Sequence, residues 1–283
     1  MSRHTPPTVL RTTLRTSRGD FAALESAPAA EVRGTAMLLP GYTKGKDDFL
    51  ALLPYLRDAG YRAVAVDGRG QDETAGPADE AAYRYDALAA DVLAQAEAVG
   101  TRVHLVGHSM GGQVARAAVL RNARPFLSLT LLSSGPGHVG EGRRLQIELL
   151  TGALATMTME QVWEAMRKLR PSTASEPELE VQRARWLRTN PIHLLVAGRE
   201  LLGEPDRTAQ LAALTELPTH MLYGDQDDTW APDLLADTAH RLGARHTVMT
   251  DTRHSPHVER AARTAAELTR FWDGLRQTPA SGR

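Results

Sequence analysis

The pattern of apolar and polar residues along the chain alternates between short strand-like runs and helix-like segments. Runs rich in Val, Leu, Ala and Thr end at clusters of Gly, Asp or Ser, which is typical of strands. Between them, apolar residues recur every three or four positions, as on one face of a helix. Eight strands are predicted, at residues 9–16, 20–26, 35–39, 62–66, 103–107, 127–132, 219–224 and 245–250. Helices are predicted between them at residues 48–59, 86–99, 110–121 and 258–275.

This alternation predicts the fold class. Strands that are apolar throughout and are separated by helices indicate a parallel sheet covered on both faces. The alternation stops after the strand at 127–132, and only helix-like patterns follow from about residue 138 to residue 206. We therefore predict an α/β fold with a mostly parallel sheet of about eight strands. Residues 1–137 and 207–283 would form its core, and residues 138–206 a helical insertion.

Composition excludes several classes of function. The 283-residue chain has a formal net charge of −1, so it lacks the basic excess of a nucleic-acid-binding protein. No apolar run approaches the roughly 18 residues of a membrane span, and the N-terminal segment has no apolar core of a signal peptide. We therefore expect a cytoplasmic protein. The absence of cysteine rules out disulfides, thiolate metal sites and a cysteine nucleophile.

The clearest chemical motif is Gly-His-Ser-Met-Gly at residues 107–111, which fits G-x-S-x-G. It lies between a predicted strand and a predicted helix, the context in which such a turn holds up a nucleophilic serine. The turn is so sharp that side chains at the flanking glycines would collide, and the strained Ser109 backbone exposes its hydroxyl oxygen. A glycine turn with an incidental serine is the alternative, but the flanking elements favour a nucleophile.

A serine nucleophile needs a base, and a histidine base needs an orienting carboxylate. His254 lies in the loop after the last predicted strand, at the sheet edge where catalytic side chains gather. His257 is its competitor, but Pro256 and Val258 place it in the first turn of a helix. His108, inside the turn, is interpreted as structural. Three carboxylates follow the strand at 219–224, and their positions alone leave the choice open: Asp225, Asp227 and Asp228.

At this point the chain resembles the α/β-hydrolase superfamily of serine hydrolases, in particular esterase-like and lipase-like members with a helical cap. MLLPGYTKGKDDF, at residues 37–49, is similar to the oxyanion loop, with Pro40 in place of the usual histidine. VAVDGRGQDET, at residues 64–74, is similar to Asp-x-Arg-Gly-x-Gly-x-Ser, with Asp72 and Thr74 in place of small residues. The order of serine, acid and histidine along the chain is also that of the family.

The resemblance implies roles for further residues. In the family the acid lies three residues past the strand-ending glycine, here Gly224, which selects Asp227 and keeps Asp228 in reserve. The backbone N–H groups of Tyr42 and Met110 would form the oxyanion hole. The insertion looks like the family's cap. Two tryptophans are candidates to border the substrate pocket, although apolar packing between helices is the alternative: Trp163 and Trp230.

We therefore expect a serine hydrolase that cleaves a carboxylic ester or a related small acyl substrate through an acyl-enzyme. No cofactor and no metal are expected, because the histidines lack the H-E-x-x-H spacing and no Lys-Ser/Thr follows the glycine-rich turn. Thioesterase, lactonase, aminopeptidase and carbon–carbon bond hydrolase activities remain alternatives on the same triad. A haloalkane dehalogenase would carry aspartate in place of Ser109. The alternative from another class is a ligand-binding member of the fold without turnover.

Overall fold

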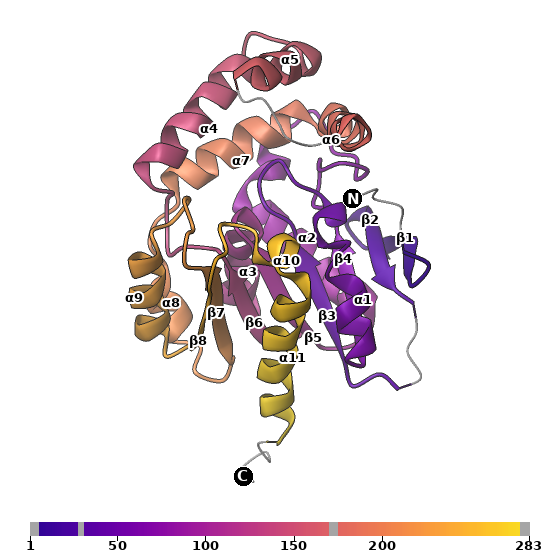
Figure 1. Ribbon diagram of the computed structural model, residues 1–283, viewed down its shortest axis with the longest axis vertical. Coiled ribbons are helices and arrows are strands. Elements are labelled where there is room, and N and C mark those ends of the chain that lie inside the picture. Colours follow the sequence, from indigo (N-terminus) through magenta and orange to yellow (C-terminus); the bar gives the residue numbers. More distant parts are fainter. Residues whose placement is uncertain (1–5, 28–30, 170–174, 278–283) are drawn as a thin grey trace.

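The computed structural model describes residues 6–27, 31–169 and 175–277, and its centre is an eight-stranded sheet. The strands lie in the order β1-β2-β4-β3-β5-β6-β7-β8 (Figure 1). Their bounds are β1 Val9–Thr16, β2 Gly19–Ser26, β3 Gly34–Leu39, β4 Tyr61–Val66, β5 Val103–His108, β6 Phe126–Leu132, β7 Thr219–Gly224 and β8 Arg245–Met249. Each predicted strand corresponds to one of these.

The sheet is mostly parallel, which confirms the predicted fold class. Strand β1 pairs with β2, and β2 with β4, in antiparallel orientation. Every other neighbouring pair is parallel. As a result, strands β3, β5, β6, β7 and β8 all end at the same edge of the sheet, and the loops that follow them meet there.

Helices cover both faces of the sheet because successive strand residues point to opposite sides. Leu38 belongs to one apolar core, which α1 (Leu53–Asp58) and α11 (Ala261–Gln277) cover. Met37 and Leu39 belong to the other. That second core is covered by α2 Tyr85–Val99, α3 Met110–Arg121, α8 Thr208–Ala212 and α9 Pro232–Leu242. Figure 1 shows α1 and α11 in front of the sheet and α2 and α3 behind it.

Four helices follow β6 and gather above the edge at which the parallel strands end (Figure 1). We call these the cap helices: α4 Glu141–Leu154, α5 Met159–Leu169, α6 Glu176–Arg188 and α7 Pro191–Gly203. In the described part of residues 138–206 there is no strand, as the sequence pattern predicts. Within the described ranges, no helix is both long and apolar enough to cross a bilayer.

Two predicted helices are each divided in the structure. The segment predicted as one helix at residues 48–59 forms a short 3₁₀ helix, η1 (Lys46–Phe49), and then α1. Pro54 explains this, because a proline inside a continuous helix removes a hydrogen bond and its ring clashes with the preceding turn. The last predicted helix is preceded by a separate turn, α10 (Pro256–Glu259), and the chain leaves helical geometry at Arg260 before α11 begins. A second 3₁₀ helix, η2 (Glu80–Tyr83), precedes α2.

Candidate active site

The turn between β5 and α3 holds Ser109 in a strained conformation. The backbone φ angle of Ser109 is 54° and its ψ angle is −120°, in a region that non-glycine residues rarely adopt. A Cβ atom at Gly107 would overlap the Gly111 carbonyl, and one at Gly111 would overlap the carbonyl oxygen of Leu39. The glycines are therefore required because backbone segments touch where a side chain would otherwise stand.

His254 contacts the hydroxyl of Ser109 through one ring nitrogen and Asp227 through the other. The distance from His254 Nε2 to Ser109 Oγ is 3.0 Å, and His254 Nδ1 lies 3.0 Å from both carboxylate oxygens of Asp227. His254 lies in the loop between β8 and α10, and 16 % of its side chain is exposed, whereas the side chain of Asp227 is buried. The three residues predicted as a triad are thus within hydrogen-bonding distance, although they come from loops far apart in the sequence.

The loop after β7 distinguishes the three candidate carboxylates. Asp227 Oδ1 accepts hydrogen bonds from the backbone N–H groups of Thr229 (2.9 Å) and Trp230 (3.3 Å), so its orientation is fixed before it meets His254. Asp225 accepts from the backbone N–H of Thr252. The carboxylate of Asp228 is 65 % exposed and lies 3.8 Å from the guanidinium of Arg253.

Asp228 does not cap the helix that follows this loop. In the structure α9 begins after Ala231, and no side chain caps it. The chain makes a tight turn around the Asp227 carboxylate, which takes the capping-type hydrogen bonds and leaves Asp228 directed to solvent.

His108 and His257 lie behind the site rather than in it. The Nε2–H of His108 donates to the backbone carbonyl of His254 at 2.9 Å. Burial, with His257 and His254 nearby, holds the pKa of His108 well below its usual value, so its ring is neutral. His257 Nε2 lies 2.9 Å from Asp48 Oδ2, and its side chain is fully buried. The expected structural role of His108 and the helical position of His257 agree with these contacts.

Tyr42 and Met110, the two residues expected to form the oxyanion hole, directly follow Gly41 and Ser109 in the chain. Gly41, which precedes Tyr42, approaches the nucleophile so closely that a Cβ atom there would lie 3.2 Å from the Cβ of Ser109. Met110 is the first residue of α3. Among the described residues, no backbone acceptor takes the N–H of Tyr42 or of Met110. Buried N–H groups are nearly always paired, so this pair suits an oxygen atom of a ligand.

Two hollows lie over the site and share Arg143 and Gln146 in their walls. One is polar, and Arg253, Ser255 and the exposed edge of His254 also line it. The other is an apolar cavity of about 420 Å³ between Tyr42 and the cap helices. Its apolar lining includes Ile147, Leu149, Leu150, Val162, Trp163, Met166 and Leu179.

Of the two tryptophans proposed for the pocket, the structure places only Trp163 at this cavity. Trp230 lines neither hollow and is 1 % exposed. Its indole N–H donates to the backbone carbonyls of Gly137 and His138, and its ring centroid lies 6.1 Å from that of His254. The expectation for Trp230 is corrected, because its polar atom is used to hold the chain where the cap insertion begins.

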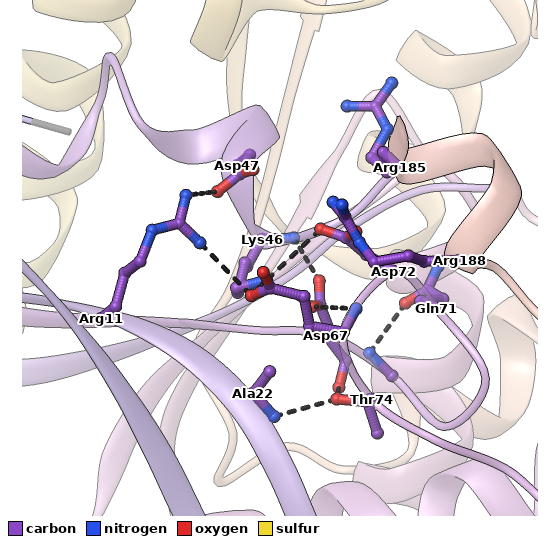
Figure 2. A network of polar contacts seen from close by, with 12 residues as sticks. Arg11, Ala22, Lys46, Asp47, Asp67, Gln71, Asp72, Thr74, Arg185 and Arg188 are labelled. Atoms are coloured by element: carbon purple, nitrogen blue, oxygen red, sulfur yellow. Dashed lines mark hydrogen bonds and ion pairs between the residues drawn. The ribbon is translucent and has the colours of Figure 1, made fainter. Parts of the chain in front are cut away.

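Two groups of side chains have the composition of metal ligands, and protein contacts occupy both. Asp67, Asp72 and Glu73 lie together, but the Lys46 ammonium lies among them, 2.7 Å from Asp67 and from Glu73. Figure 2 shows Lys46 between Asp67 and Asp72. Asp48, His108 and His257 form the other group. There the Lys44 ammonium lies 3.3 Å from Asp48, and with His257 it holds the pKa of Asp48 well below its usual value despite burial.

Arg143 and Gln146 are site residues that the sequence analysis did not identify. They lie on α4, one turn apart, and Arg143 Nη1 donates to Gln146 Oε1 at 2.9 Å. No motif surrounds them. The only available signal is their spacing of three, which puts them on one helix face without saying that this face meets the triad.

Comparison with known proteins agrees with this geometry. The sequence model described as the alpha/beta hydrolase family matches residues 36–267. Lipase 3 of Moraxella sp. (strain TA144) is 24 % identical over 250 residues, which are 85 % of this chain and 78 % of the lipase. The fold is similar to that of an esterase from Thermogutta terrifontis (TM-score 0.74, 22 % identity, covering 94 % of this chain and 99 % of the esterase). It is also similar to that of a bacterial membrane phospholipase A (TM-score 0.76, 24 % identity, covering 95 % and 87 %). At these identities the structural likeness shows the fold alone.

Proposed function

The chain belongs to the alpha/beta hydrolase family, and from this premise we propose that it is a serine hydrolase of carboxylic esters that acts through an acyl-enzyme. The observation that carries the proposal is the continuous contact from Asp227 through His254 to Ser109. The lipase relative supports the choice of an ester substrate.

In the proposed first step, Ser109 Oγ attacks the carbonyl carbon of the ester and His254 Nε2 takes its proton. The contact of 3.0 Å is within the range for such a transfer. Asp227 holds the other ring nitrogen as N–H and stabilises the imidazolium that forms. His254 then gives the proton to the leaving alcohol, which departs and leaves the acyl group on Ser109.

The tetrahedral intermediate places negative charge on the former carbonyl oxygen. The N–H groups of Tyr42 and Met110 would donate to this oxygen. Because the fold already holds these N–H groups in place, no free energy is needed to reorient them during the reaction. Water, activated by His254 in the same manner, then attacks the acyl-enzyme and releases the acid. No step requires a group beyond these residues and water.

We further assign residues 138–206 as a cap over a core of residues 1–137 and 207–283, and the apolar cavity as the acyl-binding site. The cavity adjoins Tyr42, so a chain bound there would extend from the carbonyl at the oxyanion donors. Trp163 would contact that chain. The phenol of Tyr42 donates to the backbone carbonyl of Leu194 in α7 at 2.8 Å, which ties the oxyanion loop to the cap.

The test is a fluorophosphonate label combined with a series of p-nitrophenyl esters of increasing chain length. We expect the wild-type protein to be labelled on Ser109 and to prefer esters with an apolar acyl chain over acetate. Ser109→Ala should prevent labelling and lower kcat by several orders of magnitude while the protein remains folded. A folded wild-type protein that is neither labelled nor active would instead favour a ligand-binding protein, and stronger activity on thioesters or aminoacyl amides would change the substrate class.

A further inference from the structure

A side chain 30 residues away contacts the peptide group proposed to stabilise the oxyanion. The N–H of Tyr42 and the carbonyl of Gly41 belong to the same peptide. Gln71 Nε2 donates to the Gly41 carbonyl oxygen at 3.0 Å, and the backbone N–H of Lys44 donates to the same oxygen at 3.2 Å. Because a trans peptide is planar and its C=O and N–H point in opposite directions, a contact that fixes the carbonyl also fixes the direction of the Tyr42 N–H.

The amide of Gln71 is itself held at both ends. Its Oε1 accepts from the backbone N–H of Gly68 at 2.8 Å, so its NH₂ group is the part that faces Gly41. Two different partners thus determine which end of the amide is which. Gln71 is 2 % exposed, and water therefore does not compete for these bonds.

A buried ionic cluster fixes the loop that carries Gln71 (Figure 2). Asp67, at the start of the loop, accepts from the Lys46 backbone N–H at 2.6 Å and from the Lys46 ammonium at 2.7 Å. Asp72, next to Gln71, accepts two hydrogen bonds from Arg188 at the end of cap helix α6, at 2.8 and 2.6 Å. The loop is therefore tied to the oxyanion loop on one side and to the cap on the other.

We propose that Gln71 is a positioning residue for oxyanion stabilisation. Together with the Lys44 N–H, it holds the Gly41–Tyr42 peptide so that the Tyr42 N–H points at the position of the oxyanion. By donating to the carbonyl of that peptide it also polarises the N–H into a stronger donor. The inference rests on the proposed function, because it requires an oxyanion at that place.

The test compares two buried glutamines that both donate to a backbone carbonyl. Gln113, on α3, donates to the carbonyl of Gly137 at 2.7 Å and is fully buried, but its acceptor is not part of the proposed oxyanion hole. We expect Gln71→Met to lower kcat about 10- to 100-fold with little change in KM, less than the loss of a direct donor. Affinity for a trifluoromethyl ketone, which forms an anionic adduct with the serine, should fall by the same factor. Gln113→Met should lower Tm but leave kcat within about twofold.

A second variant tests the pH dependence of kcat, which should not change if Gln71 only stabilises the fold. Gln71→Glu introduces a carboxylate that cannot donate to Gly41, and the donor returns when the carboxyl is protonated. The ratio of its kcat to that of the wild type, measured at the same pH, should therefore rise as the pH falls. If Ser109 is labelled and active but both Gln71 variants change only Tm, this inference is overturned. If Ser109 is neither labelled nor active, the proposed function fails first, and this inference fails with it.

Discussion

At the scale of single residues, the site depends on which hydrogen bonds are already made before a substrate arrives. Asp227 meets His254 with its carboxylate fixed by two backbone N–H groups. Its neighbours, Asp225 and Asp228, are used by the Thr252 backbone and by Arg253. The three carboxylates between residues 225 and 228 thus have three different roles. Asp227, whose side chain is buried, is the one that faces His254.

Replacing Asp227 should therefore affect chemistry more than stability. Asp227→Asn keeps the shape of the side chain but favours the wrong tautomer of His254, and kcat should fall on the order of 10⁴-fold, by analogy with serine proteases. Asp225→Asn and Asp228→Asn are the matched controls, and we expect each to retain kcat within about tenfold. Steady-state kinetics on a p-nitrophenyl ester would measure this. Loss of turnover in Asp228→Asn with retention in Asp227→Asn would move the assignment by one residue.

At the scale of elements, the turn between β5 and α3 is where strand, helix and oxyanion loop come into backbone contact. Gly107 lies against Gly111 and Gly112, and Gly111 lies against the end of β3. Backbone atoms cannot move aside as flexible side chains do, so these contacts leave no room for a methyl group. The strain at Ser109 persists because the packed elements around it determine its conformation.

Adding one methyl group at two different glycines tests this packing. Gly107→Ala should destabilise the fold by at least about 3 kcal/mol, because its Cβ would overlap backbone atoms. Gly152 lies in cap helix α4, and a Cβ atom added at this position has no other atom within 4 Å. Gly152→Ala is therefore the control. It should stabilise the protein by about 0.5–1 kcal/mol through helix propensity. Urea unfolding would measure both. A Gly107→Ala protein with wild-type stability would show that the turn can relax.

At the scale of the whole molecule, buried histidines make folding depend on pH. Burial lowers the pKa of His104 and of His193 to about 4, and that of His220 to about 3. Each of these imidazoles is neutral in the folded protein at pH values at which it is protonated in the unfolded chain. Their contribution to stability is therefore complete above pH of about 6.5 and is lost as the pH falls toward 4. Burial raises the pKa of Asp67 to about 6, against the attraction of Lys46. Asp67 therefore binds a proton more readily in the folded protein, and its protonation adds stability as the pH falls.

The expected result is acid lability with a slope of about three protons. His108 adds a fourth histidine, because burial holds its pKa well below the usual value. Four histidines less one aspartate amount to roughly 4 kcal/mol of lost stability per pH unit between pH 6 and pH 4.5. His193→Phe tests one of these groups, since neither ring nitrogen of His193 has a partner among the described residues and its ring packs on Tyr83. The variant should match the wild type at pH 7.5 and exceed it by about 1–2 kcal/mol at pH 5. Urea midpoints across this range would measure the slope, and equal slopes would contradict the prediction.

The sequence by itself determined the features that depend on residues close together along the chain. The strands, the helices of the core, the strained turn at Ser109 and the strand-free insertion all follow from local periodicity and from glycine positions. The division of two helices at Pro54 and Arg260 was missed, although the first carries a visible proline. The choice of Asp227 and of Tyr42 came from a family resemblance, and their catalytic roles remain predictions.

Only the tertiary structure decided which distant residues meet. Gln71 contacts Gly41, and Arg143 of the cap lines the same hollow as His254. Trp230 donates its indole N–H to His138, at the start of the insertion. None of these contacts has a local signal, because a buried polar atom takes its partner from whatever segment packs against it, and that packing is set by the whole sheet. Periodicity fixes the face on which a side chain lies, whereas its partner depends on the strand order and on the path of the loops between strands.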